Sequence, residues 1–459
     1  MSTEHRERRG GNRLVLVACI LGSVIVFVDS TVVNVALPAI EEDLGGGLAL
    51  QQWVVDAYLL TLGSLLLVGG SLGDLFGARR MFLIGIVGFG ITSILCAAAP
   101  DGTTLIIARG VQGALGAILT PAGLAVIATT FSGEARGAAI GSWTAWTGIA
   151  FVIGPLAGGW LVTNASWRWV FLVNVPFAIV TAALVAYAVP ARATGNDRAR
   201  VDVVGGVLCV LGLGGPVFAL IEEPQRGWSD PLILFSLIGG VVLFGLFVLW
   251  ESRAPQPMLP LRLFERRNFS FANLETLSVY AGLSTLTFFL VLFLQQLAGY
   301  TALRSGLALL PITVVMFLLS PRVGRLSMRY GPRWFMGLGP FIAGLALIGV
   351  IRLQPGFSYW SELLPSLLVF SIGLSMIVAP LTATVLADAG EHDAGIASGV
   401  NNAVARVAGL LGIAVVGAAV AGPQNQLDVA GFHLAMWITA LLVLAGGIIG
   451  IAGVRNRQE

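Results

Sequence analysis

The sequence contains no lysine, and charged residues of all kinds make up only 11% of its 459 residues. An ordinary soluble domain carries roughly 25% charged residues. Hydrophobic residues reach 56%, with a mean hydropathy of +0.89, which is more apolar sequence than a water-soluble core can bury. The net charge of +2 gives no sign of a nucleic-acid partner, and we expect none. The chain is predicted to be a membrane protein whose main surroundings are the lipid bilayer.

Cysteine is also scarce. Its three copies, Cys19, Cys96 and Cys209, all lie in apolar runs, so we expect neither a disulfide framework nor a metal site. Without lysine, the chain cannot carry the phosphate-binding loop GxxxxGK[ST], which argues against ATP-driven pumping. We expect no enzyme activity and no cofactor.

Fourteen long apolar runs divide the chain. About 20 apolar residues cross a bilayer as a helix, and these runs are continuous, whereas barrel strands would alternate polar and apolar residues. The first run is too long for a signal peptide and contains Asp29, so it is predicted to be a retained span. The predicted spans are 14–37, 53–72, 81–99, 104–129, 137–162, 170–189, 203–221, 232–250, 271–295, 306–323, 335–351, 363–387, 396–421 and 432–454.

The distribution of arginine predicts the orientation in the membrane. With the N-terminus placed in the cytoplasm, twenty of the 26 arginines fall in cytoplasmic segments and four in outer segments. This imbalance follows the positive-inside rule. It predicts a multi-pass protein of the cell membrane with both termini in the cytoplasm. The remaining two arginines, Arg109 and Arg406, fall inside predicted spans.

The chain is built twice. Segment 70–80 follows the second span and recurs at 324–333 after the tenth, with Gly, Leu, Gly and Arg at identical spacing. Spans one to six therefore match spans nine to fourteen, and spans seven and eight are an insert. Repeated halves of this kind predict a site near the membrane midplane between them. The predicted divisions are a basic cytoplasmic tail (1–13), an N-terminal six-helix bundle (14–190), cytoplasmic linkers with two inserted helices (191–268), a C-terminal six-helix bundle (269–454) and a cytoplasmic tail (455–459).

Five short motifs occur in order in the N-terminal half. They are 29–38 in span one, 53–58 in span two, 70–80 in the loop after it, 109–114 in span four and 141–159 in span five. Together they resemble the major facilitator superfamily and, within it, the fourteen-span drug:proton antiporters. Two positions depart from the pattern: Ala150 stands where the motif usually has glycine, and Met328 stands in the second loop where the first has Asp74.

The resemblance implies an all-α polytopic membrane protein with the major facilitator fold, made of two six-helix bundles plus two inserted helices. It also implies alternating access, in which hydrophobic drugs or antibiotics are exported in exchange for protons. Cationic compounds are one option for the substrate. We expect a monomer whose partners are the bilayer, protons and a hydrophobic small molecule.

Asp29 and Asp56 lie inside predicted spans, where an ionised carboxylate costs at least about 2.5–3.5 kcal/mol. Such a group either fastens neighbouring helices or exchanges protons and meets a cationic substrate in a water-filled cavity. Arg109, in span four, cannot lose its charge and needs a partner. We predict that this partner is Asp56, near the outer end of span two. Proton coupling is assigned to Asp29, Asp56 and Arg109.

The resemblance assigns Gly141, Gly154, Pro155, Gly158 and Gly159 to an antiporter motif. Gly154 and Gly158 form a GxxxG face that lets another helix approach closely. Pro155 removes a backbone hydrogen bond and permits bending. Such packing suits helices that rock between inward-open and outward-open states.

The loop after span two is predicted to act as an inner gate through Gly70, Asp74, Gly77, Arg79 and Arg80. A carboxylate at Asp74 beside a helix N-terminus, with an arginine next to it, would hold the gate shut. A solvated run of charges is the alternative interpretation.

Weaker candidates for substrate binding are Asn34, Gln112, Trp146 and Glu275. Trp146 is near the glycine face of span five but could simply pack there, and Glu275 could extend to the membrane surface instead. Two other functions remain open: a receptor or scaffold that does not transport, and proton-coupled uptake of a small metabolite. The intramembrane charges favour transport over a scaffold, because a scaffold has no need of such costly groups.

Overall fold

The structure is a computed structural model that describes residues 3–190, 200–422 and 425–456. Within these residues, fourteen helical segments are long and apolar enough to cross a membrane. They coincide with the fourteen predicted spans, so the all-α, fourteen-span prediction is confirmed. Parts of the predicted tails and of the first linker (1–2, 191–199 and 457–459) lie outside the described residues.

The helices extend beyond the apolar runs because polar residues satisfy the backbone groups at their ends. Asp101 accepts a hydrogen bond from the Thr104 amide, and Asp230 accepts one from the Leu232 amide, each at 2.8 Å. Such caps stabilise helix starts.

Most predicted spans correspond to one helix each. The sixth predicted span comprises α6 and α7, the ninth comprises α10 and η2, and the twelfth and thirteenth lie in η3 and α13. The elements are α1 (Thr3–Leu44), α2 (Gly47–Phe76), α3 (Ala78–Ala97), α4 (Gly102–Thr130), α5 (Gly133–Asn164), α6 (Trp169–Leu172), α7 (Asn174–Ala188), α8 (Val203–Arg226), α9 (Pro231–Glu251), η1 (Leu261–Glu265), α10 (Arg267–Leu292), η2 (Phe293–Leu297), α11 (Ala302–Tyr330), α12 (Pro332–Ile351), η3 (Tyr359–Leu363), α13 (Leu364–Val420) and α14 (Val429–Gly453).

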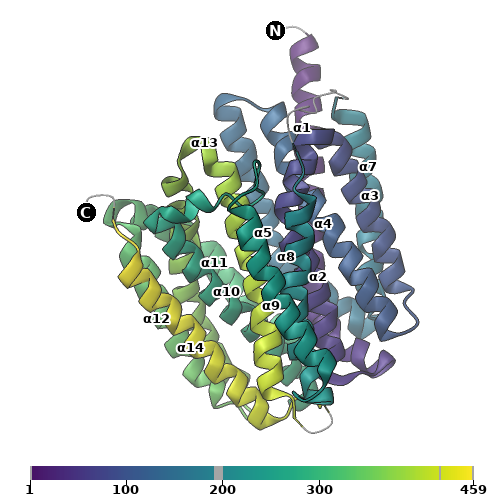
Figure 1. The fold of residues 1–459 in the computed structure, drawn as a ribbon, viewed down its shortest axis with the longest axis vertical. Helices are drawn as coiled ribbons and strands as arrows, with labels where there is room; N and C mark the ends of the chain where they lie inside the picture. The colour runs from purple at the N-terminus through teal and green to yellow at the C-terminus, as the bar shows by residue number, and fades with distance from the viewer. Residues whose placement is uncertain (1–2, 191–199, 423–424, 457–459) are drawn as a thin grey trace.

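Helices α1–α7 pack into one bundle, called here the N-bundle, and α10–α14 pack into a second, the C-bundle (Figure 1). The sequence repeat is also a structural repeat. After the first repeated loop, Arg79 donates to the carbonyl oxygen of Ala186 in α7 at 2.9 Å. After the second, Arg333 donates to the carbonyl oxygen of Ile451 in α14, also at 2.9 Å. In each bundle the loop arginine therefore ties the start of one helix to the end of the last.

The inserted helices α8 and α9 lie at the boundary between the bundles. Helix α8 contacts α2 of the N-bundle and α13 of the C-bundle, while α9 packs on α8, and Figure 1 shows the pair in teal. The Trp53 indole of α2 donates to Glu222 of α8 at 2.9 Å and lies 6.0 Å from the Phe218 ring, between ring centroids. The insert thus covers the line along which α2 and α13 meet.

The hydrogen bonds between the bundles gather at one side of the molecule, called here the far side because it lies opposite the N-terminus (Figure 1). Four hydrogen bonds join the bundles within the described residues, and all lie toward this side. Toward the other side α5 has few neighbours, since a side chain at Gly137, Gly141 or Gly148 would meet no atom within 4 Å. The bundles are therefore closed together at the far side. The four bonded pairs are Gln52 with Ile413, Gln295 with Val35, Leu303 with Thr163, and Asn425 with Gly46.

Candidate functional site

The N-bundle holds a fully buried ion pair between α1 and α4. The Arg109 guanidinium lies 2.6 Å from Asp29 Oδ2, and the two side chains are 1% and 0% exposed. Arg109 also donates through Nε to the carbonyl oxygen of Val54 in α2, at 3.0 Å. Because a buried charge must be paired and hydrogen-bonded to persist in an apolar interior, each partner depends on the other.

The second oxygen of Asp29 is bonded too. Asp29 Oδ1 accepts hydrogen bonds from Gln112 of α4 at 3.1 Å and from Asn174 of α7 at 2.9 Å. The Gln112 amide also accepts from Arg109 at 2.6 Å and donates to Ser93 of α3 at 2.9 Å. The resulting network links α1, α3, α4 and α7. Sequence reasoning missed Asn174 and Ser93, although a lone polar residue such as Asn174 inside an apolar span was an available signal.

Two aromatic rings enclose the guanidinium. Its central carbon lies 4.2 Å from the centre of the Tyr58 ring in α2 and 5.7 Å from that of Phe171 in α6. Both distances are within the range of a cation–π interaction, which strengthens when the cation is shielded from water. The two rings and the three polar partners Val54, Asp29 and Gln112 leave Arg109 no room to turn toward another carboxylate.

The predicted pairing of Arg109 with Asp56 is wrong. Val54 and Tyr58 both contact Arg109 and stand four residues apart, so they share one face of α2. Asp56 lies two residues from each, which on an α-helix is nearly the opposite side. It is also wholly buried, not open to water at a span end, and neither of its carboxylate oxygens has a hydrogen-bond partner in the described part of the chain.

The position of Asp56 can be read from its neighbours on α2. Gln52 lies one turn before it and bonds to α13, while Leu60 lies one turn after it and borders Gly214 of α8. Asp56 therefore stands on the face of α2 that meets α13 and α8, at the boundary between the bundles. The two predicted coupling carboxylates occupy different environments, one saturated inside the N-bundle and one unpaired at its edge.

The glycines of α5 allow close approach on two sides. A Cβ atom added at Gly154 would lie 1.9 Å from Thr31 Oγ1 of α1, and one at Gly158 would lie 2.5 Å from Val32 Cγ2 of the same helix. A Cβ at Gly159 would instead lie 2.6 Å from the Leu303 Cα of α11. The motif thus binds α5 to α1 within the N-bundle and to α11 across the boundary.

The contact with α11 is made by both backbones. A Cβ atom at Gly306 of α11 would lie 2.4 Å from the carbonyl oxygen of Pro155. The remaining motif residue, Gly141, lies apart from this contact, exposed and with nothing within 4 Å. Two of the five motif residues, Pro155 and Gly159, therefore form the contact with α11 at the far side. Gly158 lies beside them and faces α1.

The predicted inner gate is not formed in this structure. Asp74 is exposed in the last turn of α2 and makes no ion pair or hydrogen bond within the described residues, and Arg80 is exposed. Arg79 is bonded inside its own bundle, as described above. Gly77 turns the chain with φ of 90°, a conformation that side chains rarely adopt, and a Cβ at Gly70 would lie 3.9 Å from Pro121 of α4. The motif shapes a turn here and does not lock the two bundles.

The weaker candidates are scattered. Gln112 belongs to the Asp29 network, but Trp146 is 52% exposed on α5. Asn34 is partly buried, and its carbonyl oxygen has no partner within the described residues. Glu275 does not extend to the surface: it is wholly buried in the C-bundle, beside Gly450 of α14, with both oxygens unpartnered in the same part of the chain.

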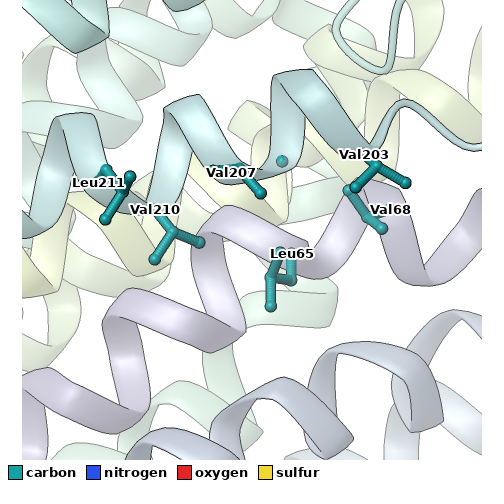
Figure 2. A pocket seen from close by; sticks show the side chains of 7 residues that line it. Leu65, Val68, Val203, Val207, Val210 and Leu211 are labelled. Atoms are coloured by element: carbon teal, nitrogen blue, oxygen red, sulfur yellow. The ribbon is translucent and has the colours of Figure 1, made fainter.

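Two hollows border the bundle boundary. One, of about 320 Å³, is apolar and lies between α2 and α8, with Leu65 and Val68 on one wall and Val203, Val207, Val210 and Leu211 on the other (Figure 2). The other, of about 520 Å³, lies at the far side among α1, α5, η2 and α11 and is lined in part by Glu41 and Glu42. Neither contains Asp29, Asp56 or Arg109.

Comparison with known proteins gives a consistent result. The sequence model described as Major Facilitator Superfamily matches residues 19–413. The chain is 35% identical over 450 residues to the uncharacterized MFS-type transporter EfpA of Mycobacterium tuberculosis, covering 94% of this chain and 84% of that one. It is 38% identical over 407 residues to the puromycin resistance protein pur8 of Streptomyces alboniger (87% and 80%). The methylenomycin A resistance protein of Bacillus subtilis is 34% identical over 441 residues (94% and 93%).

Solved structures agree in fold. The peptide transporter POT, crystallised with sulfate, superposes with a TM-score of 0.70 at 14% identity, covering 95% of this chain and 94% of that one. The xylose transporter XylE from E. coli superposes with a TM-score of 0.64 at 13% identity, covering 97% and 96%. At such low identity the likeness concerns the fold alone.

Proposed function

Since the chain belongs to the Major Facilitator Superfamily, we propose that it exports a hydrophobic drug or antibiotic across the cell membrane in exchange for protons. Three relatives that are 34–38% identical are named for resistance to, or export of, antibiotics. The arginine imbalance supports a cytoplasmic position for both termini, and the far side is then the outer side. The structure then corresponds to a state closed toward the outside.

The observation that carries the proton coupling is the position of Asp56. An ionised carboxylate that is buried without a partner costs several kcal/mol, so Asp56 is proposed to carry a proton in this state. It stands where α2 meets α13 and α8, and this boundary has to rearrange when the bundles rock. Rearrangement would admit water, and the proton would leave. Asp29 is proposed to hold α1, α4 and α7 together, because three donors from α4 and α7 bind its carboxylate.

A susceptibility test addresses export. An efflux-deficient bacterial host expressing the chain should tolerate higher concentrations of one or more antibiotics, beginning with puromycin, methylenomycin A and tetracenomycin C, the compounds named for three relatives. An Asp56→Asn strain at equal protein level should lose this protection. A host that became more sensitive would favour uptake. No change with any compound of a broad panel would favour a protein that does not transport.

Vesicle experiments separate proton coupling from substrate movement. In proteoliposomes, Asp56→Asn should abolish accumulation driven by an imposed pH gradient but keep exchange of labelled for unlabelled substrate within about twofold of wild type, since exchange needs no net proton movement. Asp29→Asn should lose both and should melt at lower temperature, because an unpaired Arg109 costs about 3–5 kcal/mol. Wild-type gradient-driven rates in Asp56→Asn would end the claim that Asp56 carries the proton.

A further inference from the structure

A second arginine inside the membrane, Arg406, differs from Arg109 in having no polar partner in the part of the chain that the structure describes. It lies midway along the thirteenth span, Asp393–Val420, which α13 carries. Within the described residues it makes no ion pair and no hydrogen bond, and its one close aromatic contact is with Phe27 of α1, 5.2 Å from guanidinium carbon to ring centre. A charge at this depth costs at least about 2.5–3.5 kcal/mol if it faces lipid.

Arg406 does not face lipid, because its neighbours belong to both bundles. A Cβ atom at Gly63 of α2 would lie 3.1 Å from the Arg406 Cβ. Phe27, which contacts the guanidinium, belongs to α1. The hydroxyl groups of Tyr58 in α2 and Tyr280 in α10 lie within electrostatic range of the guanidinium. Arg406 therefore stands where α1, α2, α10 and α13 meet, at the centre of the molecule.

This central position is open rather than sealed. Arg406 and Tyr280 are each partly exposed, and Asn402, one turn nearer the terminal side on the same face of α13, is exposed. The face of α13 that carries Asn402 and Arg406 looks across the boundary at α1 and α2. Since the bundles are closed at the far side, this exposure is toward a space that opens on the side of the termini.

No described carboxylate balances the charge of Arg406. Asp29 is committed to Arg109, Gln112 and Asn174. Asp56 and Glu275 are wholly buried and form no ion pair with any residue that the structure describes. Within the described residues, Arg406 is therefore a partly exposed cation at the bundle boundary with no carboxylate partner.

We propose that Arg406 binds an acidic group of the transported compound, such as a carboxylate, phenolate or sulfonate on an aromatic scaffold. A guanidinium offers a planar fork of donors that suits such a group. Tyr280 adds a hydroxyl that makes no hydrogen bond within the described residues. This proposal rests on the proposed export function and replaces a cationic substrate by an acidic one. A cationic substrate was expected to bind the carboxylate of Asp29, but that carboxylate is occupied by Arg109, Gln112 and Asn174.

The test compares two dyes of one scaffold and opposite charge, fluorescein and rhodamine 123, by equilibrium binding to the purified, reconstituted protein. Wild type should bind fluorescein more tightly. Arg406→Gln should weaken fluorescein binding about tenfold or more, as expected for loss of a charge-assisted hydrogen bond, and leave rhodamine 123 unchanged or tighter. Arg406→Lys, which keeps the charge but not the fork, should recover part of the affinity. Arg253→Gln removes an exposed arginine outside the boundary and should behave as wild type.

Three results would overturn the proposal: tighter binding of rhodamine 123 by wild type, fluorescein affinity within twofold of wild type in a folded Arg406→Gln protein, or no binding of either dye. A melting curve for each variant shows whether Arg406 acts only by holding α13 against Phe27, in which case both dyes would lose affinity together. Binding at equilibrium needs neither a proton gradient nor a direction of transport. The dye-binding result can therefore be interpreted even if the export or proton-coupling test fails.

Discussion

Replacing Gly159 by alanine tests whether the contact between α5 and α11 closes the far side. The added Cβ would lie 2.6 Å from the Leu303 Cα and 2.7 Å from the carbonyl oxygen of Ala302. Ordinary contact begins near 3.4 Å, so α5 and α11 would have to separate by roughly 0.7–0.8 Å. Both obstructing atoms belong to the backbone, so no side-chain rotation relieves the clash.

The expected cost is about 1–3 kcal/mol, as for other overpacked contacts. It falls only on the state closed at the far side, so the balance between the two states should move by roughly 5- to 150-fold toward the open one. Spin labels at two exposed positions, Asn164 on α5 and Arg304 on α11, would report this by electron–electron distance measurement. The longer distance should gain population, and export should fall about tenfold or more.

Gly148→Ala is the matched control, since that position on the same helix has nothing within 4 Å. Gly306→Ala approaches the same contact from α11, where the new Cβ would lie 2.4 Å from the Pro155 carbonyl oxygen, and should shift the distances in the same direction. If Gly159→Ala and Gly306→Ala both keep the wild-type distance distribution and export within twofold, the closure does not depend on this contact.

Two further predictions concern packing and orientation. Gly154→Leu should abolish export at a normal protein level, because even its Cβ would lie 1.9 Å from Thr31 Oγ1, whereas Gly148→Leu should be tolerated; export by Gly154→Leu at the wild-type rate would refute a role for close packing of α5 on α1. Alkaline phosphatase fused after Arg457 should be inactive and the same enzyme fused after Gly45 active; the reverse pattern would invert the topology.

The sequence was sufficient for architecture because the information is local or repeated. A membrane span is recognised from its own run of apolar residues. The duplication is recognised because segment 70–80 recurs at 324–333. Arg109 and Asp29 could be singled out for the same reason, since a charge in an apolar run is costly wherever the helix is placed. These predictions needed no knowledge of which helices are neighbours.

The carboxylate partner of Arg109 could not be predicted from the sequence, because it depends on how each helix is rotated about its axis. Asp56 and Asp29 are both carboxylates in spans near Arg109, and which one meets it depends on the face of α2 that turns toward α4. Val54 and Tyr58 take that face, and Asp56 is left on the other. The open surroundings of Arg406 were equally hidden, because they arise from contacts between helices that are more than a hundred residues apart.

Arg109 and Arg406 both lie inside membrane spans, but their surroundings differ. The network around Arg109 saturates every partner, and a saturated buried network resists rearrangement because each broken bond leaves a charge uncompensated. The N-bundle should therefore move as one body. Asp56 and Arg406, the groups proposed to exchange a proton and a ligand, both lie at the bundle boundary, and neither has a hydrogen-bond or ion-pair partner among the described residues. The proposed rocking would therefore leave the paired Asp29 and Arg109 undisturbed and would change the surroundings of Asp56 and Arg406.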